Sequence, residues 1–189
     1  MVSPWRGLNY EAQAVTYEAT DRAPYLDGWK NYGLLLITAL KDLSDEQLKL
    51  RTAPHQWAIW QLAAHIAGTR TYWFDLIDGC SDELRDFFGV ASTTVPGLPL
   101  EDAGWEDDED QPRNAAELVD ALTRTWQMVE ERLHGWSPDE LQMEFHRSRG
   151  RVRRFSRHWV IWHLMEHEIH HGGEISQILG THGLTPVDL

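Results

Sequence analysis

The chain has 189 residues, of which 42% are hydrophobic and 25% are charged, and its formal net charge is −13. This length and composition predict one globular domain that spans residues 1–189. The negative charge argues against binding to nucleic acid, because phosphate recognition needs a basic surface. The single cysteine, Cys80, excludes an intramolecular disulfide and a cysteine-rich zinc site. Without a signal-peptide pattern or a membrane-spanning apolar run, we expect a cytoplasmic protein with no membrane partner.

Four segments have the apolar spacing that is typical of long helices, and they cover residues 24–43, 59–77, 115–134 and 156–179. The sequence from Asn114 to Glu117 resembles a capping box at the start of the third helix, and Gly180 can end the fourth. Ser44 and Ser137 each precede acidic residues in a pattern that predicts the start of a short helix.

The segment from residue 89 to residue 113 carries prolines, glycines and clustered acids, and it predicts a long irregular connection. Its acidic run, residues 101–110, is interpreted as a solvated loop. No strand pattern is strong, although residues 145–155 could form a short hairpin around Gly150. The predicted fold is therefore all-α, a four-helix bundle with a long irregular link between helices 2 and 3.

A weak internal repeat relates the second and fourth helices. The sequence WAIWQLAAHIAGT begins at Trp57, and WVIWHLMEHEIHH begins at Trp159. Aligning the two tryptophans places His65 opposite His167. Two similar helix pairs related by a pseudo-twofold axis would hold these histidines at equivalent depths, so we expect their imidazoles to converge if the helices face each other.

Histidines are concentrated on the fourth predicted helix. His163, His167 and His171 follow one another at intervals of four residues, so they share one helical face. Val160 and Leu164 are assigned to the same face, which predicts that it points toward the core.

Imidazoles that face a core need partners, because burying an unpaired polar group is unfavourable. A divalent metal bound by His65, His167 and His171 would satisfy them, and three protein ligands leave one coordination position open for catalysis. His163 and Glu174 continue the same face and are candidates for residues beside the site. A hydrogen-bonded core histidine is the alternative for His65 taken alone.

Residues from His167 to His171 also match H-E-x-x-H, the signature of zinc metalloproteases, in which Glu168 would be the general base. One protease group needs glycine and histidine further on, where Glu174 and Gln177 stand here. Another takes a glutamate from well downstream, but the chain ends soon after the motif. We interpret the match as accidental.

The segments from Trp57 to His65 and from His163 to Ile175 resemble the DinB/YfiT-like metal-binding superfamily, and the likeness extends from about Tyr25 to Leu179. The resemblance implies a four-helix bundle with a three-histidine metal site. Gly172 and Glu174 stand where the usual motif has a basic residue and a glutamine. The implied ligands fall on three residues, His65, His167 and His171.

Characterised members of this family include bacillithiol- and mycothiol-dependent enzymes. The resemblance therefore implies a divalent metal, zinc or nickel, that binds a low-molecular-weight thiol and lowers its pKa for attack on an electrophilic substrate. The arginines between Arg147 and Arg157 would then hold the carboxylates of the thiol, or else form a charge-balancing connector. His163 or Glu174 would orient a ligand or move a proton.

Two other functions remain open from the sequence. One is a non-catalytic metal-binding protein with a role in stress response or interaction, and the other is a metal-dependent hydrolase. Trp162, Met165 and Ile169 lie away from the histidine face, and they predict a homodimer interface or part of the core.

Overall fold

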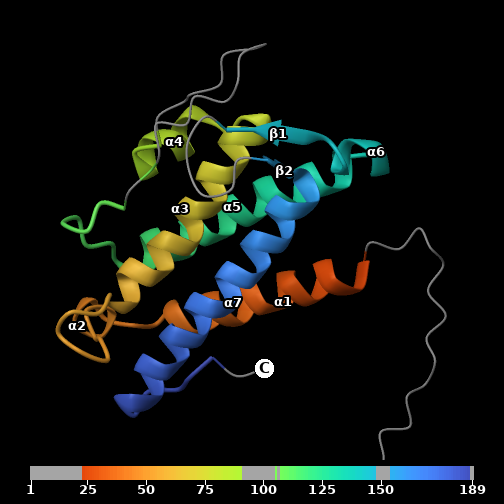
Figure 1. Cartoon of the computed structure of the whole chain (residues 1–189). Helices are drawn as coiled ribbons and strands as arrows, with labels where there is room; N and C mark the ends of the chain where they lie inside the picture. Colours follow the sequence, from red (N-terminus) through yellow and green to blue (C-terminus); the bar gives the residue numbers. More distant parts are fainter. Residues whose placement is uncertain (1–22, 91–104, 106, 148–153, 188–189) are drawn as a thin grey trace, which may run out of the picture.

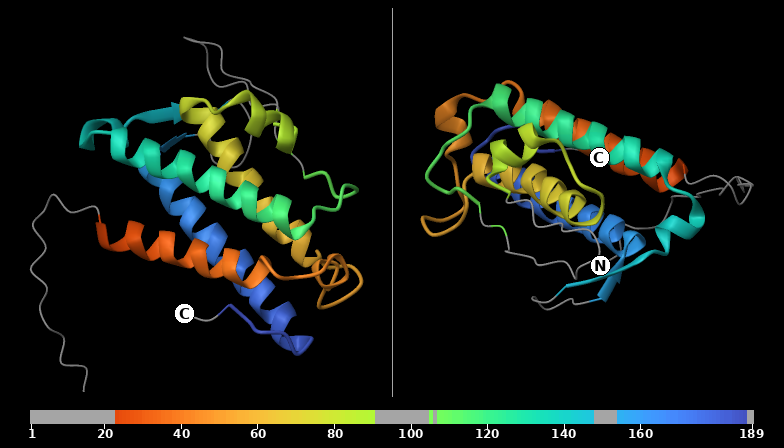
Figure 2. Two further views of the ribbon diagram at one scale, coloured as in Figure 1. Left: turned by 180° about the vertical axis from the view of Figure 1, so that it is seen from behind. Right: turned by 90° about the horizontal axis from the view of Figure 1, so that it is seen from above.

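The computed structural model describes residues 23–90, 105, 107–147 and 154–187. Four long helices dominate it (Figure 1): α1 (Ala23–Leu40), α3 (Ile59–Asp78), α5 (Ala115–Gly135) and α7 (Arg157–Thr181). α3 packs against both α5 and α7, and α1 packs against the same two helices. Seen from above, α1 lies beside α5 and α3 lies beside α7 (Figure 2). The predicted all-α four-helix bundle is confirmed.

Short elements close the two ends of the bundle. At one end lie α4 (Asp82–Phe88), α6 (Pro138–Leu141) and a hairpin of β1 (Glu144–His146) and β2 (Arg154–Ser156) (Figure 1). The other end carries α2 (Asp45–Leu48). The strands pair antiparallel, with Phe145 opposite Phe155, where the sequence suggested a hairpin.

Capping side chains explain where several helices begin. Ser44, Asn114 and Ser137 each accept a hydrogen bond from a backbone N–H three residues on, and each is half of a capping box. α4 was not predicted, although Ser81 caps its first turn and Gly89 ends it with a left-handed backbone, φ 64°. The expected irregular link therefore begins after α4, and much of it lies outside the described residues.

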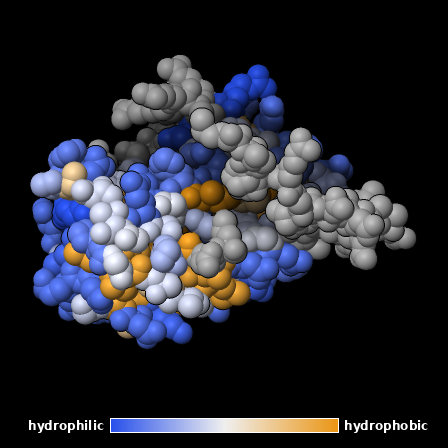
Figure 3. Space-filling model, turned by 90° about the horizontal axis from the view of Figure 1, so that it is seen from below, coloured by the Kyte–Doolittle hydropathy of each residue, from blue (hydrophilic) through white to orange (hydrophobic). Residues whose placement is uncertain are grey.

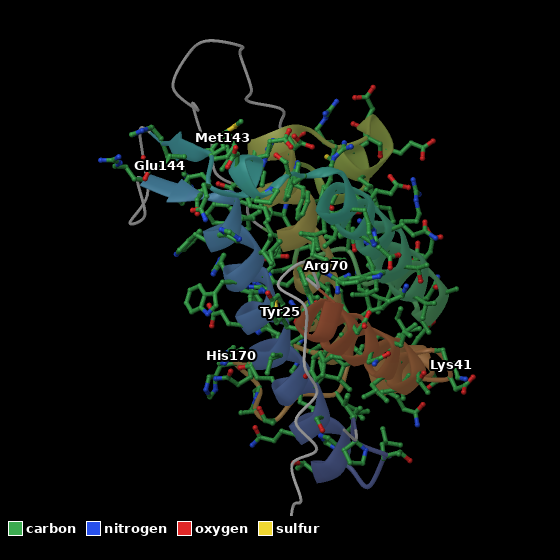
Figure 4. The ribbon with its side chains drawn as sticks, turned by 90° about the vertical axis from the view of Figure 1, so that its right-hand side faces the viewer. Tyr25, Lys41, Arg70, Met143, Glu144 and His170 are labelled. Carbon is green, nitrogen blue, oxygen red and sulfur yellow. The ribbon has the colours of Figure 1, made fainter. Side chains whose placement is uncertain are left out.

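The core consists of two apolar clusters with a polar layer between them. One cluster contains Leu36, Ile66 and Leu122, and the other contains Phe74 and Leu164. The polar layer is made of the buried side chains of Arg70, Thr125 and Glu168. Figure 4 shows Arg70 inside the bundle, among the long helices.

The described surface combines patches of apolar and hydrophilic residues, as one face shows (Figure 3). Large apolar side chains that remain exposed include Leu34 of α1 and both Trp162 and Ile169 of α7. Met165, by contrast, packs against the second core cluster. Among the described helices, none combines the length and the apolar character that crossing a bilayer would require.

Candidate metal centre

Three histidines from two helices meet at the interface of α3 and α7. The Nε2 atoms of His65 and His167 lie 3.0 Å apart. The His171 ring lies 4.5 Å from the His167 ring and 5.0 Å from the His65 ring, centroid to centroid. One nitrogen from each residue lies within 4.8 Å of the others. The structure thus brings together the three residues that the sequence predicted as ligands.

Helix geometry produces this cluster. His167 and His171 are four residues apart, so their side chains project from the same face of α7. α3 packs along α7 and brings His65 to the same level. The repeat in the sequence therefore pointed to a real convergence of His65 with His167.

Two carboxylates hold the outer nitrogens of the cluster. Asp107 Oδ2 lies 2.7 Å from His65 Nδ1, and Glu174 Oε2 lies 2.7 Å from His171 Nδ1. A carboxylate accepts a hydrogen bond from the Nδ1–H group, which fixes the tautomer in which Nε2 carries the free lone pair. The usual carboxylate–histidine–metal arrangement has the same form.

The donor set fits a divalent metal ion. Two imidazole lone pairs at 3.0 Å repel each other unless a proton or a cation lies between them. Metal–nitrogen bonds of roughly 2.0–2.1 Å would place neighbouring ligand nitrogens about 3–3.4 Å apart, close to this separation. His65, His167 and His171 are the residues that would hold the ion.

The environment of His167 and His171 favours their neutral forms. Burial, followed by the neighbouring His171 and His65, lowers the pKa of His167 to about 3. Burial also lowers the pKa of His171, although the Glu174 carboxylate opposes the shift. Neutral imidazole is the form that binds a metal, so protons compete little for this site near pH 7.

Aromatic rings cover the His65 side of the cluster. The Trp57 ring meets the His65 ring edge-on at 4.8 Å, and the Trp105 ring stacks on it at 5.8 Å. Trp105 donates a hydrogen bond from Nε1 to the Phe88 carbonyl, at 2.7 Å. Its ring also packs against Gly68, where any larger residue would collide with it. This wall limits the access of water to His65.

Of the two residues expected beside the site, Glu174 is in direct contact with it through His171. His163 lies next to the cluster. Its ring centroid is 5.7 Å from that of His167, and the ring stacks on Trp159 at 4.8 Å. Burial lowers the pKa of His163 as well. His170 is 67% exposed, and Figure 4 shows it on the outer side of α7.

Glu168 occupies a different environment from the one that the H-E-x-x-H motif would require. Its Oε2 accepts hydrogen bonds from Arg70 Nη2, at 2.6 Å, and from Trp29 Nε1. Arg70 Nη1 donates to the Leu122 carbonyl at 3.0 Å and to Thr125 Oγ1 at 3.2 Å. The Glu168 carboxylate therefore belongs to the buried polar layer of the core.

The position of Glu168 corrects the predicted orientation of α7. Val160, Leu164 and Glu168 are almost fully buried, as Ile175 and Leu179 are further along the helix, whereas the three histidines are only partly buried and lie beside this stripe. The sequence did carry a signal for Glu168, because it continues the four-residue spacing of Val160 and Leu164. Nothing comparable marked Arg70 as its partner.

The arginines near the hairpin have partners within the chain. Arg154 pairs with Glu144 and Arg157 pairs with Asp78, at 2.6 Å and 2.8 Å. Arg147 donates to the Tyr72 hydroxyl at 2.9 Å. These three side chains favour the charge-balancing interpretation over a cradle for an anion; residues 148–153 of the same stretch lie outside the described residues.

Asp107 and Trp105 were missed from the sequence. Both belong to the link whose acids were interpreted as solvated, and Asp107 is 42 residues from its partner His65. Neither spacing nor composition distinguishes Asp107 from the acids beside it. Only the path of the link over α3 brings its carboxylate to the imidazole.

Taken together, the fold and the cluster define a four-helix bundle whose facing helices carry three histidines able to hold a metal ion. The sequence profile of the DinB superfamily matches residues 35–175, which is most of the chain. The chain belongs to the DinB superfamily.

Solved structures share this fold. A DinB-like protein from Bacillus cereus superposes with a TM-score of 0.60 at 18% identity, covering 87% of this chain and 95% of that one. A conserved protein from Enterococcus faecalis gives a TM-score of 0.61 at 12% identity, covering 82% of this chain and 95% of that one. No curated protein matches this chain. At these identities the likeness concerns the fold alone.

Proposed function

We propose that this protein binds one divalent metal ion, zinc or nickel, through His65, His167 and His171. The observation that carries the proposal is the convergence of three ring nitrogens within 4.8 Å of one another. The carboxylates of Asp107 and Glu174 support it, because they orient His65 and His171 as they would orient metal ligands.

We further propose that the bound metal serves the transfer of a low-molecular-weight thiol to an electrophilic substrate. A divalent metal with three protein ligands has a position open for a thiol and lowers the pKa of that thiol. The chain has no suitable thiol of its own in the described part, because burial, followed by the charge of Asp75, raises the pKa of Cys80 to about 12. The nucleophile would therefore come from a small molecule.

The chain's own residues would orient the site and keep water out. Asp107 and Glu174 accept hydrogen bonds from the Nδ1–H groups of His65 and His171, and the rings of Trp57 and Trp105 cover His65. A hydrolase would need a carboxylate beside the open position to activate water. Among the described residues, the two carboxylates that contact the cluster are hydrogen-bonded to ligand imidazoles, and Glu168 is bonded to Arg70, which supports thiol transfer over hydrolysis.

The test of metal binding is elemental analysis of untagged protein, comparing wild type with His65→Ala and His134→Ala. His134 is exposed, and its Nδ1 contacts only a carbonyl of its own helix among the described contacts, so His134→Ala is a matched control. We expect about one zinc or nickel ion per chain in wild type and in His134→Ala, and its loss in His65→Ala. Wild type that stays metal-free after reloading, or full occupancy in His65→Ala, would overturn the proposal.

Catalysis needs its own test on metal-loaded protein. Wild type and His171→Ala would be incubated with bacillithiol or mycothiol and an electrophile such as monochlorobimane. Thiol transfer by wild type alone would support the transferase. Full metal occupancy without transfer of any thiol tested would favour the non-catalytic alternative.

We also propose that two copies associate through the face formed by α1 and α7. Trp162 and Ile169 of α7 are 58% and 55% exposed. The Tyr32 hydroxyl contacts the Ile169 carbonyl at 3.4 Å, so the two helices are adjacent there. Light scattering should give a dimer mass for wild type and a monomer mass for Trp162→Glu/Ile169→Glu; a monomeric wild type would exclude this interface.

A further inference from the structure

A cavity lies next to the histidine cluster and is separate from it. Its volume is about 360 Å³, which is within the range of small-molecule sites. The start of α3, the end of α4 and the link before α5 enclose it. None of the three clustered histidines lines it, but Asp107, which holds His65, does.

Aromatic side chains form much of the cavity wall, and they are Trp57, Trp60, Phe87, Phe88 and Trp105. Several are held in place by hydrogen bonds or ring contacts. Trp57 Nε1 donates to Glu109 Oε1 at 3.2 Å, and Trp105 is fixed on the Phe88 carbonyl. Phe87 and Phe88 pack edge to face at 4.8 Å. The faces of such rings attract a cation that has lost part of its water shell.

The charged lining of the cavity is strongly acidic. It contains four carboxylates and one guanidinium, a net charge of −3, and these residues are Asp86, Asp107, Asp108, Glu109 and Arg113. The guanidinium lies 4.1 Å from the centre of the Phe87 ring and donates to the Phe87 carbonyl at 2.9 Å. Among the described lining residues, the one positive group is thus already bonded to the protein, and the net charge of the lining stays negative.

We propose that this cavity binds an organic cation, a small ammonium compound with an apolar or aromatic body. Aromatic rings and carboxylates together form the environment that recognises an ammonium group, and they repel an anion of the same size. The overall charge of −13 adds a long-range attraction for cations. The site requires no metal, so it goes beyond the proposed metal binding and does not rest on it.

The probe is benzyltrimethylammonium, titrated by calorimetry into chelator-treated, full-length protein. Benzyl alcohol and benzoate provide a neutral and an anionic comparison of similar size. We expect saturable binding of one cation per chain, at least about tenfold weaker binding of the alcohol, and no binding of benzoate. Equal binding of the cation and the alcohol would overturn the proposal, and so would an absence of cation binding.

Paired charge variants locate the site. Asp108→Asn/Glu109→Gln removes two charges from the cavity lining, whereas Asp110→Asn/Asp120→Asn removes two acids that do not line it. Asparagine and glutamine keep the side-chain oxygens that accept from the Asp110 N–H and from Trp57. The first pair should weaken cation binding about tenfold and the second less than twofold. Equal weakening by both would mean a diffuse charge effect and would refute the site.

These outcomes are independent of the metal proposal. Cation binding without any metal uptake would leave the cavity assignment standing while the metal site fails. Metal uptake without cation binding would do the reverse. A Trp105→Ala variant adds a third readout, since loss of one aromatic wall should weaken the cation without adding or removing charge.

Discussion

Replacing Glu168 with glutamine should destabilise the protein by about 3–5 kcal/mol, because it leaves the Arg70 guanidinium in the core without its counter-ion. The two side chains are 1% and 2% exposed, and Nη2 lies 2.6 Å from Oε2. Glutamine has nearly the same volume as glutamate, so the change creates no cavity. The loss of stability therefore measures an uncompensated buried charge.

The surroundings of the pair set where in this range the value should fall. Arg70 keeps hydrogen bonds to the Leu122 carbonyl and to Thr125, which favours the lower half of the range. The exposed pair of Lys49 and Glu46, with side chains 50% and 85% exposed, is the matched control. Glu46→Gln should change the unfolding free energy by less than about 1 kcal/mol.

The assay is urea unfolding of the chelated protein, since bound metal would add its own stabilisation. Arg70→Met/Glu168→Gln removes both charges, and it should be less destabilising than the sum of the two single changes. A Glu168→Gln variant within about 1 kcal/mol of wild type would refute the reasoning, as would strictly additive single changes.

Three further predictions concern single positions. The pKa of His167 in the folded protein, about 3, lies below its ordinary value of 6.5. Between pH 3 and pH 6.5 the His167 side chain is therefore protonated in the unfolded chain and neutral in the folded one. The stability of metal-free protein should therefore fall by about 1.4 kcal/mol per pH unit as pH drops from 6.5 toward 3, and His167→Asn should flatten the profile; an unchanged slope would contradict this. Cys80, whose pKa is raised to about 12, should react far more slowly with Ellman's reagent at pH 8 in folded protein than in urea, and equal rates would contradict its burial. Gly172→Ala should destabilise the protein by about 1–2 kcal/mol, because the added methyl group would collide with the Tyr32 ring. Gly173→Ala is the control: its methyl group has no neighbour within 4 Å, so it should stabilise the protein by up to about 1 kcal/mol. Equal urea midpoints for the two variants would argue against the contact between Gly172 and Tyr32.

Local patterns in the sequence determined the secondary structure. The start of α5 follows from the Asn114 side chain, which accepts a hydrogen bond from a backbone N–H three residues on, whereas α7 continues one residue past Gly180, to Thr181. Four-residue spacing aligned His167 with His171, and the repeat in the sequence related His65 to them. Such information is local or periodic, so it can be read without knowing how the helices pack.

Tertiary structure alone decided which distant groups meet. Glu168 pairs with Arg70 across 98 residues of sequence, and Asp107 reaches His65 across 42. The sequence does not distinguish an acidic residue that is solvated from one that is paired, either in a charged loop or in an amphipathic helix. Their partners depend on how α3, α5, α7 and the link pack, because packing determines which charges lose their water and must find another charge instead.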